Sequence, residues 1–358
     1  MPTFIDTHCH IDTILERLGG TAEALFECMN PAPEAIIHVA CDPKDFNWGG
    51  EFLSRKTING VKIYGAFGVH PLLAESFCEQ AEREIFEYLK LPGALALGEI
   101  GLDYHYSGYS PDLQKKVFLR QIEMGLELNK PFVFHLREAE DDAFEILRKI
   151  DSENLKVHIH CYTGTANFAE KVLSLKGNYF FGFTGAITFD KTATIREAAA
   201  AIPLNKILLE TDAPYLAPVP FRGKICTPAM IPNIAQVLAN IKKVPLDELF
   251  KICKKNTEEM YKLSTLNSQL STPNSQLSTL NSQLPTLNSQ LSTLNSQLPT
   301  LNSQLPTLNS QLSTLNSQLP TLNSQLSTLN SQLSTPNSQL PTLNSQLPTN
   351  PPPRPETV

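Results

Sequence analysis

About 260 residues at the start of the chain alternate between short apolar runs and longer segments with helical periodicity. The apolar runs are rich in β-branched and aromatic residues, which favours strands, and eight of them occur, at residues 3–7, 35–40, 63–69, 95–100, 131–134, 156–159, 178–183 and 206–210. Between them lie amphipathic segments such as residues 111–129, which open with a proline suited to a first helical turn. Alternating strands and helices predict a parallel sheet, and eight units predict its closure into a (β/α)8 TIM-type barrel. A doubly wound open sheet of similar size is the alternative.

From about Ser264 the pattern changes to a seven-residue repeat, Asn-Ser-Gln-Leu-(Ser/Pro)-Thr-(Leu/Pro), which occurs twelve times. Leucines three and four residues apart, as at Leu277, Leu280 and Leu284, resemble a coiled-coil seam. Prolines within the repeat, the lack of charges that would fix a register, and the poor helix formers Ser, Thr and Asn argue against such a helix. We therefore expect a folded domain at residues 1–261 and a disordered low-complexity tail at residues 262–358. A partner-dependent or self-associating assembly and an ordered coiled coil are the alternatives for the tail.

Composition and charge exclude some classes of protein. All aromatic, Cys and His residues precede Ser264, so the core-forming material lies in the first part of the chain. The net charge of -7 argues against a broad basic surface that would bind duplex nucleic acid irrespective of sequence. The seven cysteines show no paired spacing, which is typical of reduced thiols, and no apolar stretch has the length of a signal or a membrane span. We expect a monomeric, cytoplasmic protein without membrane contact.

Side chains with metal-binding chemistry gather at one end of the predicted strands. Six of them stand at the ends of five strands: His8, His10, Glu99, His135, His160 and Asp212. A barrel collects its active site at this end, and alternation along the first strand puts His8 and His10 on one face with Cys9 pointing away. Imidazole and carboxylate are ligands for divalent ions. The set is large enough for two ions about 3.5–4 Å apart that share a carboxylate.

Three further polar residues lie at the same mouth and are candidates for contact with substrate: His70, Asp103 and Arg137. A structural turn is the alternative for His70, and an ion pair with Glu138 at the start of the next helix is the alternative for Arg137. His38 and His158 fall within predicted strands and are expected to pack in the core. His105, in the loop after Glu99, could lie near substrate or simply on the surface.

Six segments follow the order and spacing of the TatD hydrolases. They are residues 6–12 (DTHCHID), 68–71 (GVHP), 98–104 (GEIGLDY), 134–139 (FHLREA), 160–164 (HCYTG) and 209–215 (LETDAPY). Over residues 3–261 the chain resembles the TatD family of metal-dependent deoxyribonucleases. The resemblance implies an amidohydrolase-like barrel, two divalent ions (Mg, Mn or Zn), and hydrolysis of DNA phosphodiesters from strand ends.

The resemblance also implies how the ligands divide. One ion would be held by His8, His10, Glu99 and Asp212, and the other by Glu99, His135 and His160, with Glu99 as the bridge. In such a centre the ions lower the pKa of a bound water and polarise a phosphoryl oxygen, while Asp212 orients or deprotonates the water. Asp212 and Glu99 are therefore the predicted catalytic residues.

The chain departs from the family pattern in two loops, which concerns its substrate more than its chemistry. Leu72 stands where a second His is frequent, and Arg222-Gly223-Lys224 is followed by Ile225 where the family shows Asn-Glu-Pro. A deoxyribonuclease acting on DNA ends is the expected function. An ester or amide hydrolase, such as a deacylase of aminoacyl-tRNA, would use the same activated water and is the alternative. A scaffold protein organised by the repeat tail is a third hypothesis.

Overall fold

The structure is a computed structural model that describes residues 3–263, 286, 289–290 and 305–334. The chain divides into two compact units, Met1–Leu263 and Ser264–Val358. The predicted domain boundary lies two residues before the observed one. Helix α10 (Leu246–Tyr261) ends at Tyr261, and Leu263 beyond it is buried, so the first unit includes the first residues of the predicted tail.

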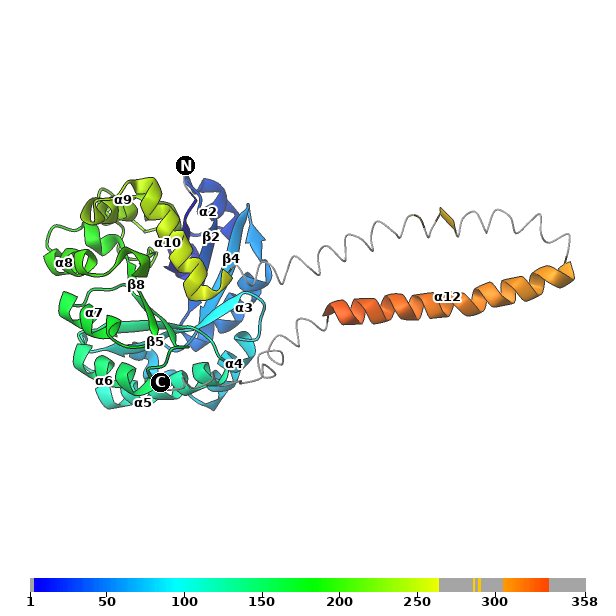
Figure 1. Ribbon diagram of the computed structural model, residues 1–358, viewed down its shortest axis with the longest axis horizontal. Helices are drawn as coiled ribbons and strands as arrows, with labels where there is room; N and C mark the ends of the chain where they lie inside the picture. Colours follow the sequence, from blue (N-terminus) through cyan, green and yellow to red (C-terminus); the bar gives the residue numbers. More distant parts are fainter. Residues whose placement is uncertain (1–2, 264–285, 287–288, 291–304, 335–358) are drawn as a thin grey trace, which may run out of the picture. The chain divides into compact units, whose positions relative to one another are not determined.

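Eight parallel strands form a nearly closed barrel in the order β1-β2-β4-β5-β6-β7-β8-β9 (Figure 1). Their bounds are β1 Ile5–Cys9, β2 Ala35–Ala40, β4 Val61–Phe67, β5 Ala94–Asp103, β6 Phe132–Arg137, β7 Lys156–His160, β8 Asn178–Phe183 and β9 Ile207–Leu209. The two-residue strand β3 (Thr57–Ile58) pairs antiparallel with β4. Beyond β9 the chain meets β1 through a bridge between Cys9 and Ala213. The TIM-type prediction is confirmed, and the open doubly wound sheet is excluded.

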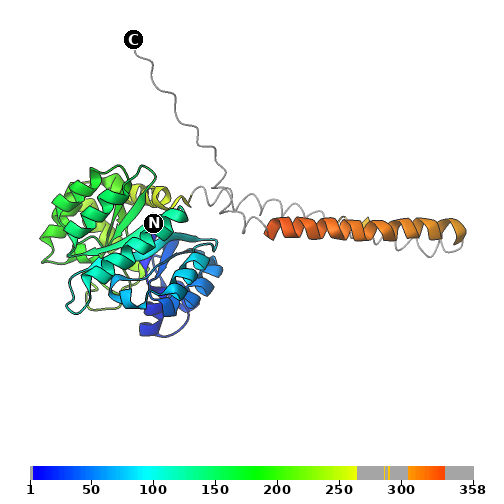
Figure 2. The same ribbon diagram turned by 90° about the horizontal axis from the view of Figure 1, so that it is seen from below.

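Helices cover the outside of the barrel (Figures 1 and 2). Their bounds are α1 Ile11–Leu18, α2 Ala22–Cys28, α3 Phe46–Ser54, α4 Glu79–Tyr88, α5 Pro111–Glu127, α6 Glu140–Ile150, α7 Ala166–Leu173, α8 Ala193–Ala201, α9 Ile231–Lys242 and α10 Leu246–Tyr261. Short 3₁₀ turns lie at Pro43–Asp45, Pro71–Ser76, Gly185–Thr188, Leu204–Lys206 and Pro228–Met230. The start of α5 follows the prediction, because Pro111 occupies the first turn and the Ser110 hydroxyl accepts from the Leu113 N–H at 3.3 Å. Within the described ranges, no helix has both the length and the apolar character needed to cross a membrane.

Apolar side chains fill the space between the sheet and the helices. Phe118 of α5 packs edge-on against Phe134 of β6, with ring centroids 4.8 Å apart, and both rings are buried. In β8, Phe180, Phe181 and Phe183 have no exposed surface. Strands covered on both faces read as continuous apolar runs, which explains why the sequence pattern predicts all eight.

Two strands that carry site residues differ from their predicted bounds. β1 runs to Cys9, so His8 lies within it, and β5 continues four residues past Glu99 to Asp103. Polar side chains interrupt the apolar pattern there, yet the backbone stays paired, with Asp103 opposite Arg137 of β6. The sequence pattern marks the end of the apolar run, whereas the strand ends where pairing ends.

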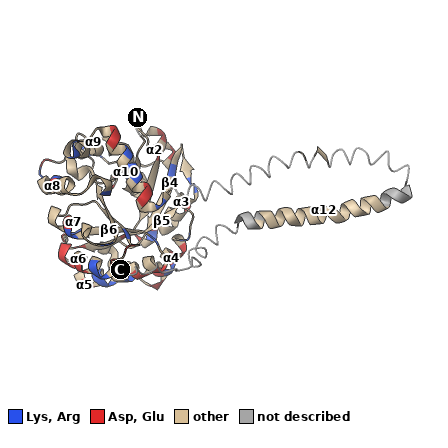
Figure 3. Cartoon of the chain, in the orientation of Figure 1, with Lys and Arg blue, Asp and Glu red and all other residues tan. Residues whose placement is uncertain are grey.

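The second unit contains helix α12 (Leu305–Ser334), which spans Pro320. The sequence predicts a disordered tail, whereas the structure describes these residues as a helix. Leucines at helical spacing run along α12, and side-chain hydroxyls satisfy backbone carbonyls, as where Thr314 Oγ1 donates to the Ser310 carbonyl at 2.8 Å. Figure 3 shows no acidic or basic residue in the described part of this helix. The predictions for residues 264–285, 287–288, 291–304 and 335–358 lie outside the described residues.

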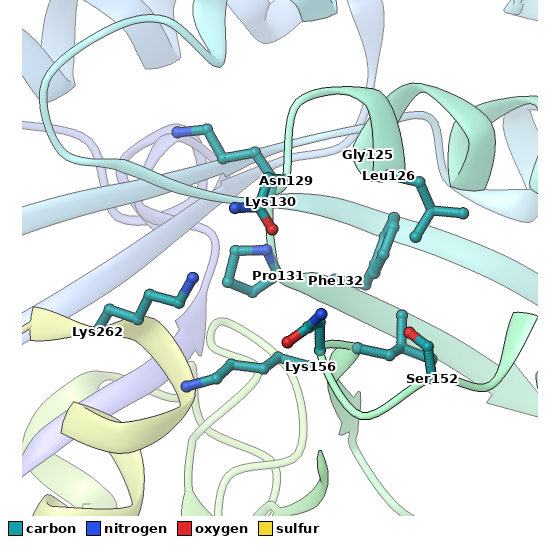
Figure 4. A pocket seen from close by; sticks show the side chains of 11 residues that line it. Gly125, Leu126, Asn129, Lys130, Pro131, Phe132, Ser152, Lys156 and Lys262 are labelled. Carbon is teal, nitrogen blue, oxygen red and sulfur yellow. The ribbon is translucent and has the colours of Figure 1, made fainter. Parts of the chain in front are cut away.

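A pocket of about 160 Å³ lies at the end of the barrel where the strands begin (Figure 4). Lys130 precedes β6, Lys156 opens β7 and Lys262 follows α10, and all three line the pocket. The Lys130 ammonium donates to the Ala94 carbonyl at 2.6 Å. Burial, with a smaller effect from the charge of Lys262, lowers the pKa of Lys130 to about 8. This pocket contains none of the predicted site residues.

Candidate metal centre

A cavity of about 1460 Å³ opens at the other end of the barrel, where the strands end. Eight of the nine predicted site residues line it: His10, His70, Glu99, Asp103, His135, Arg137, His160 and Asp212. The ninth, His8, is fully buried beside Glu99. The structure therefore brings together side chains from β1, β5, β6 and β7 and from the segments after β4 and β9.

One oxygen of the Glu99 carboxylate faces the two histidines of the first strand. Glu99 Oε2 lies 3.3 Å from His8 Nε2 and 3.8 Å from His10 Nε2. The Asp212 carboxylate closes this group, with Oδ1 at 3.4 Å from His10 Nε2 and 3.8 Å from His8 Nε2. Asp212 has φ 55°, a left-handed conformation that Asp adopts more readily than most residues. Two imidazoles and two carboxylates thus surround one point.

The other oxygen of Glu99 faces a second group of histidines. Glu99 Oε1 lies 2.7 Å from His135 Nδ1, 2.8 Å from His160 Nε2 and 3.3 Å from His70 Nε2. His135 Nδ1 and His160 Nε2 are themselves 3.0 Å apart. A carboxylate whose two oxygens face separate imidazole groups has the arrangement of a bridging ligand between two cations.

Hydrogen bonds on the far side of two rings orient the nitrogens that face Glu99. His10 Nδ1 lies 2.9 Å from the Val39 carbonyl, which accepts its proton, so that in the neutral ring the lone pair is on Nε2. His135 Nε2 lies 3.0 Å from Asp103 Oδ2, which likewise leaves Nδ1 free. Asp103 Oδ1 also accepts from the His105 backbone N–H at 3.0 Å. Asp103, predicted as a substrate contact, is thus placed as a support for His135.

The electrostatics of the cluster favour the binding of cations. Burial alone would raise the pKa of Glu99, but the charges of His160 and His70 and hydrogen bonds to His135 outweigh it and hold the pKa well below its ordinary value. Burial would lower the pKa of His10, yet Asp212 raises it to about 9, so the site retains a positive charge next to this carboxylate. A divalent ion satisfies the same demand without a proton. The donor set and its electrostatics therefore fit divalent metal.

Two glutamines that the sequence pattern does not single out form hydrogen bonds to the backbone next to site residues. Gln121 and Gln114 lie on the buried face of α5. The Gln121 amide accepts from the Val69 N–H at 2.7 Å and donates to the Val69 carbonyl at 3.1 Å, immediately before His70. The Gln114 amide binds the two backbone groups of Asp103 in the same way, at 2.8 and 2.9 Å. The sequence did contain a signal for them, because Gln114 and Gln121 are seven residues apart and lie among the apolar positions of one helix.

Cys41 and Arg137 also line the cavity. Cys41 follows β2, and its sulfur lies within 4.8 Å of ligand atoms of His10 and Glu99, a position that its place after a strand could have indicated. Arg137 lines the cavity, while Glu138 pairs with His105, Oε1 to Nδ1 at 2.6 Å, and not with Arg137 as the alternative held.

The two discounted histidines are buried. His38 Nδ1 accepts from the Ile11 backbone N–H at 3.2 Å, beneath the mouth. His158 lies deeper in the barrel, with Nε2 2.8 Å from Glu210 Oε2 and Nδ1 2.8 Å from the Tyr261 hydroxyl. Both rings thus have partners within the protein core.

Comparison with known proteins identifies the family. Residues 5–262 match the sequence profile described as TatD related DNase. The chain belongs to the TatD family. Among its TatD relatives is the Escherichia coli protein YcfH, described as an uncharacterized metal-dependent hydrolase, which is 38% identical over 274 residues covering 74% of this chain and 98% of YcfH. The chain is accordingly a metal-dependent hydrolase of this family.

Two further TatD relatives bear on fold and substrate. The crystal structure of the TatD homologue YJJV from E. coli superposes with a TM-score of 0.66 at 26% identity, covering 72% of this chain and 98% of YJJV. The human protein TATDN2, described as a 3'-5' RNA nuclease, is 35% identical over 270 residues. That match covers 73% of this chain but 35% of the human protein.

Proposed function

We propose that this TatD protein is a nuclease that removes nucleotides from the ends of single-stranded DNA, using two divalent ions and an activated water. The observation that supports the proposal best is the position of Glu99, whose two oxygens face separate groups of ligands. A centre with two ions about 3.5–4 Å apart is typical of enzymes that displace an oxygen at phosphorus. The family description and the RNA nuclease activity of the human relative both concern nucleic-acid phosphodiesters.

In this proposal some side chains bind the substrate and others transfer a proton. When bound, the metal ions supply positive charge that lowers the pKa of water and neutralises phosphate. Burial would raise the pKa of Asp212, but hydrogen bonding from His10 and the charge of His8 lower it, so the carboxylate is ionised at neutral pH. We expect this ionised carboxylate, which lines the cavity, to accept the proton of the attacking water. His70 lines the same cavity, and because its Nδ1 accepts from the Leu72 N–H at 3.1 Å, its Nε2 is the proposed donor to a phosphate oxygen.

The proposal is tested with metal-stripped protein resupplied with Mg, Mn or Zn. Labelled single-stranded DNA, RNA of the same sequence and an acylated tRNA are offered in parallel. Metal-dependent release of mononucleotides from DNA, lost in Glu99→Gln and retained in the surface control Glu87→Gln, is the expected result. Release from RNA alone would replace DNA as the substrate, and release of the acyl group with intact nucleic acid would refute the nuclease proposal.

A further inference from the structure

An aromatic ring and a guanidinium group are paired on one side of the cavity mouth. The Arg17 guanidinium carbon lies 4.5 Å from the centroid of the Tyr215 ring. Arg17 belongs to α1, Tyr215 follows Asp212 by three residues, and both line the cavity. Tyr215 is 44% exposed, and its ring lies edge-on to that of His10 with centroids 6.3 Å apart. An apolar face and a positive charge thus lie beside the first ligand group.

A second pair of the same kind lies beside the other ligand group. The Arg137 guanidinium carbon is 5.3 Å from the centroid of the Tyr106 ring. Arg137 is two residues beyond His135 on β6, and Tyr106 lies in the connection between β5 and α5. Both line the cavity, and Tyr106 is 48% exposed.

The barrel topology puts the two pairs on opposite sides of the metal-binding cluster. One pair stands at the junction of β9 and β1, and the other at β5 and β6. In the strand order, β2 and β4 separate these junctions in one direction and β7 and β8 in the other. A ligand that reaches both pairs therefore spans the mouth of the barrel, in the cavity that Glu99 also lines.

The charges around the mouth give the arginines a particular role. Four acidic residues also line the cavity: Asp12, Glu16, Asp42 and Asp45. The remaining lysine of the lining, Lys44, already pairs with Asp42 at 3.0 Å. Arg17 and Arg137 are thus the cavity's cations without a carboxylate partner among the described residues. The two arginines are therefore the places where positive charge offsets the acidic wall for an incoming polyanion.

We propose that the Tyr215–Arg17 and Tyr106–Arg137 pairs are the two nucleotide-holding sites for a single strand, one on each side of the cleaved bond. The inference rests on the proposed nuclease function and names the residues that select its substrate. Each ring stacks a base, and each guanidinium contacts an adjacent phosphate. Bases inside a duplex are stacked on one another, so the rings accept unpaired nucleotides and disfavour paired ones.

The test compares two phosphodiesters that differ in whether they carry bases. Full-length protein is assayed with a labelled single-stranded oligonucleotide and with methyl 4-nitrophenyl phosphate. In Tyr215→Ala and in Tyr106→Ala, kcat/KM for the oligonucleotide is expected to fall about 5-fold to about 150-fold relative to kcat/KM for the small diester, mainly through KM. The Phe variants keep the ring and should restore the ratio. Tyr109→Ala is the matched control, because Tyr109 is 47% exposed but does not line the cavity.

A second readout does not depend on turnover. Binding of a hydrolysis-resistant phosphorothioate strand is measured at several salt concentrations for wild type, Arg17→Gln and Arg137→Gln. Each variant should lower the slope of log affinity against log salt by about 0.7, the value for one phosphate contact on a single strand. An unchanged slope in both variants would overturn the arginine part of the inference.

The outcomes separate this inference from the function on which it rests. Wild-type protein that hydrolyses the small diester but no oligonucleotide would refute the nuclease proposal together with the two nucleotide sites. If wild type degrades the oligonucleotide, but the Ala variants lose both substrates in parallel or the Phe variants fail to restore the ratio, the nuclease stands. In that case the tyrosines are structural and the inference is wrong.

Discussion

Asp103 offers a sharp test of the proposed second metal site, because its carboxylate contacts His135, a proposed ligand, and is not itself in the proposed ligand set. Its carboxylate is 1% exposed and accepts the His135 Nε2 proton at 3.0 Å. A hydrogen bond to a charged group in such a place contributes about 1.5–3 kcal/mol. Loss of a partner of this kind typically weakens metal affinity or activity about 10-fold to 100-fold, which is the same range of free energy. Asp103→Ala should therefore weaken the second of two Mn binding steps by one to two powers of ten.

In the assay, metal-stripped wild type and variant are titrated with Mn, and calorimetry measures the heat of binding. The Mn affinity of Asp103→Asn should lie between those of wild type and Asp103→Ala, since Asn keeps a hydrogen-bond acceptor but not the charge. Asp151→Ala is the matched control, because Asp151 is likewise a carboxylate that accepts hydrogen bonds, from the Lys176 and Gly177 backbone N–H groups at 2.8 Å each, but at the far end of the barrel. Equal Mn affinity in wild type and Asp103→Ala would refute the role assigned to Asp103.

Three more changes have expected outcomes. Gln121→Leu leaves the buried N–H and C=O of Val69 without partners, which should lower the free energy of unfolding by about 2–6 kcal/mol in denaturant titrations. The pKa of Lys130 is about 8 in the folded chain against 10.5 when exposed, so the unfolded chain binds more protons between these values and stability rises with pH across that window. Between pH 7.5 and 10.5, the increase in the free energy of unfolding should be smaller by about 3 kcal/mol in Lys130→Met than in wild type. Thermal melts at the two pH values measure it. Truncation after Leu263 should leave turnover and melting temperature unchanged while removing the circular dichroism signal of α12.

Each of these predictions has a control or a result that contradicts it. Gln80→Leu alters an exposed glutamine on α4 and should cost little, so equal losses would show that the backbone of Val69 does not need its amide partner. Lys149→Met removes a lysine from the exposed part of α6 and should leave the pH dependence intact. A drop in melting temperature on truncation would mean that the tail stabilises the barrel.

The sequence predicts the barrel and groups the candidate ligands at one mouth, for a physical reason. Parallel strands buried on both faces require uninterrupted apolar residues, so the runs stand out, and their ends all meet at one mouth. His8, His135 and Asp212 could therefore be grouped without any knowledge of side-chain positions. The ends of β1 and β5 were misplaced because the polar ligands themselves break the apolar pattern while the backbone stays paired.

The parts that the sequence does not predict depend on contacts between distant segments. Gln121 meets Val69 across 52 positions, and Asp103 meets His135 across 32, so neither partner can be inferred from local spacing. The pairing of Tyr106 with Arg137 likewise exists because two loops converge at the mouth. Helix α12 was not predicted because poor intrinsic propensity was weighed above the regular spacing of its leucines.

The central claim is that Glu99 joins two metal sites, and the metal content of the protein tests it most directly. Wild type and Glu99→Ala are loaded with Mn, desalted, and analysed for metal and protein in the same sample. The arrangement of ligands on both sides of Glu99 predicts two ions per chain in wild type and loss of the two-ion state in the variant. Two tightly held ions in Glu99→Ala, or one ion in wild type at saturation, would contradict the bridge.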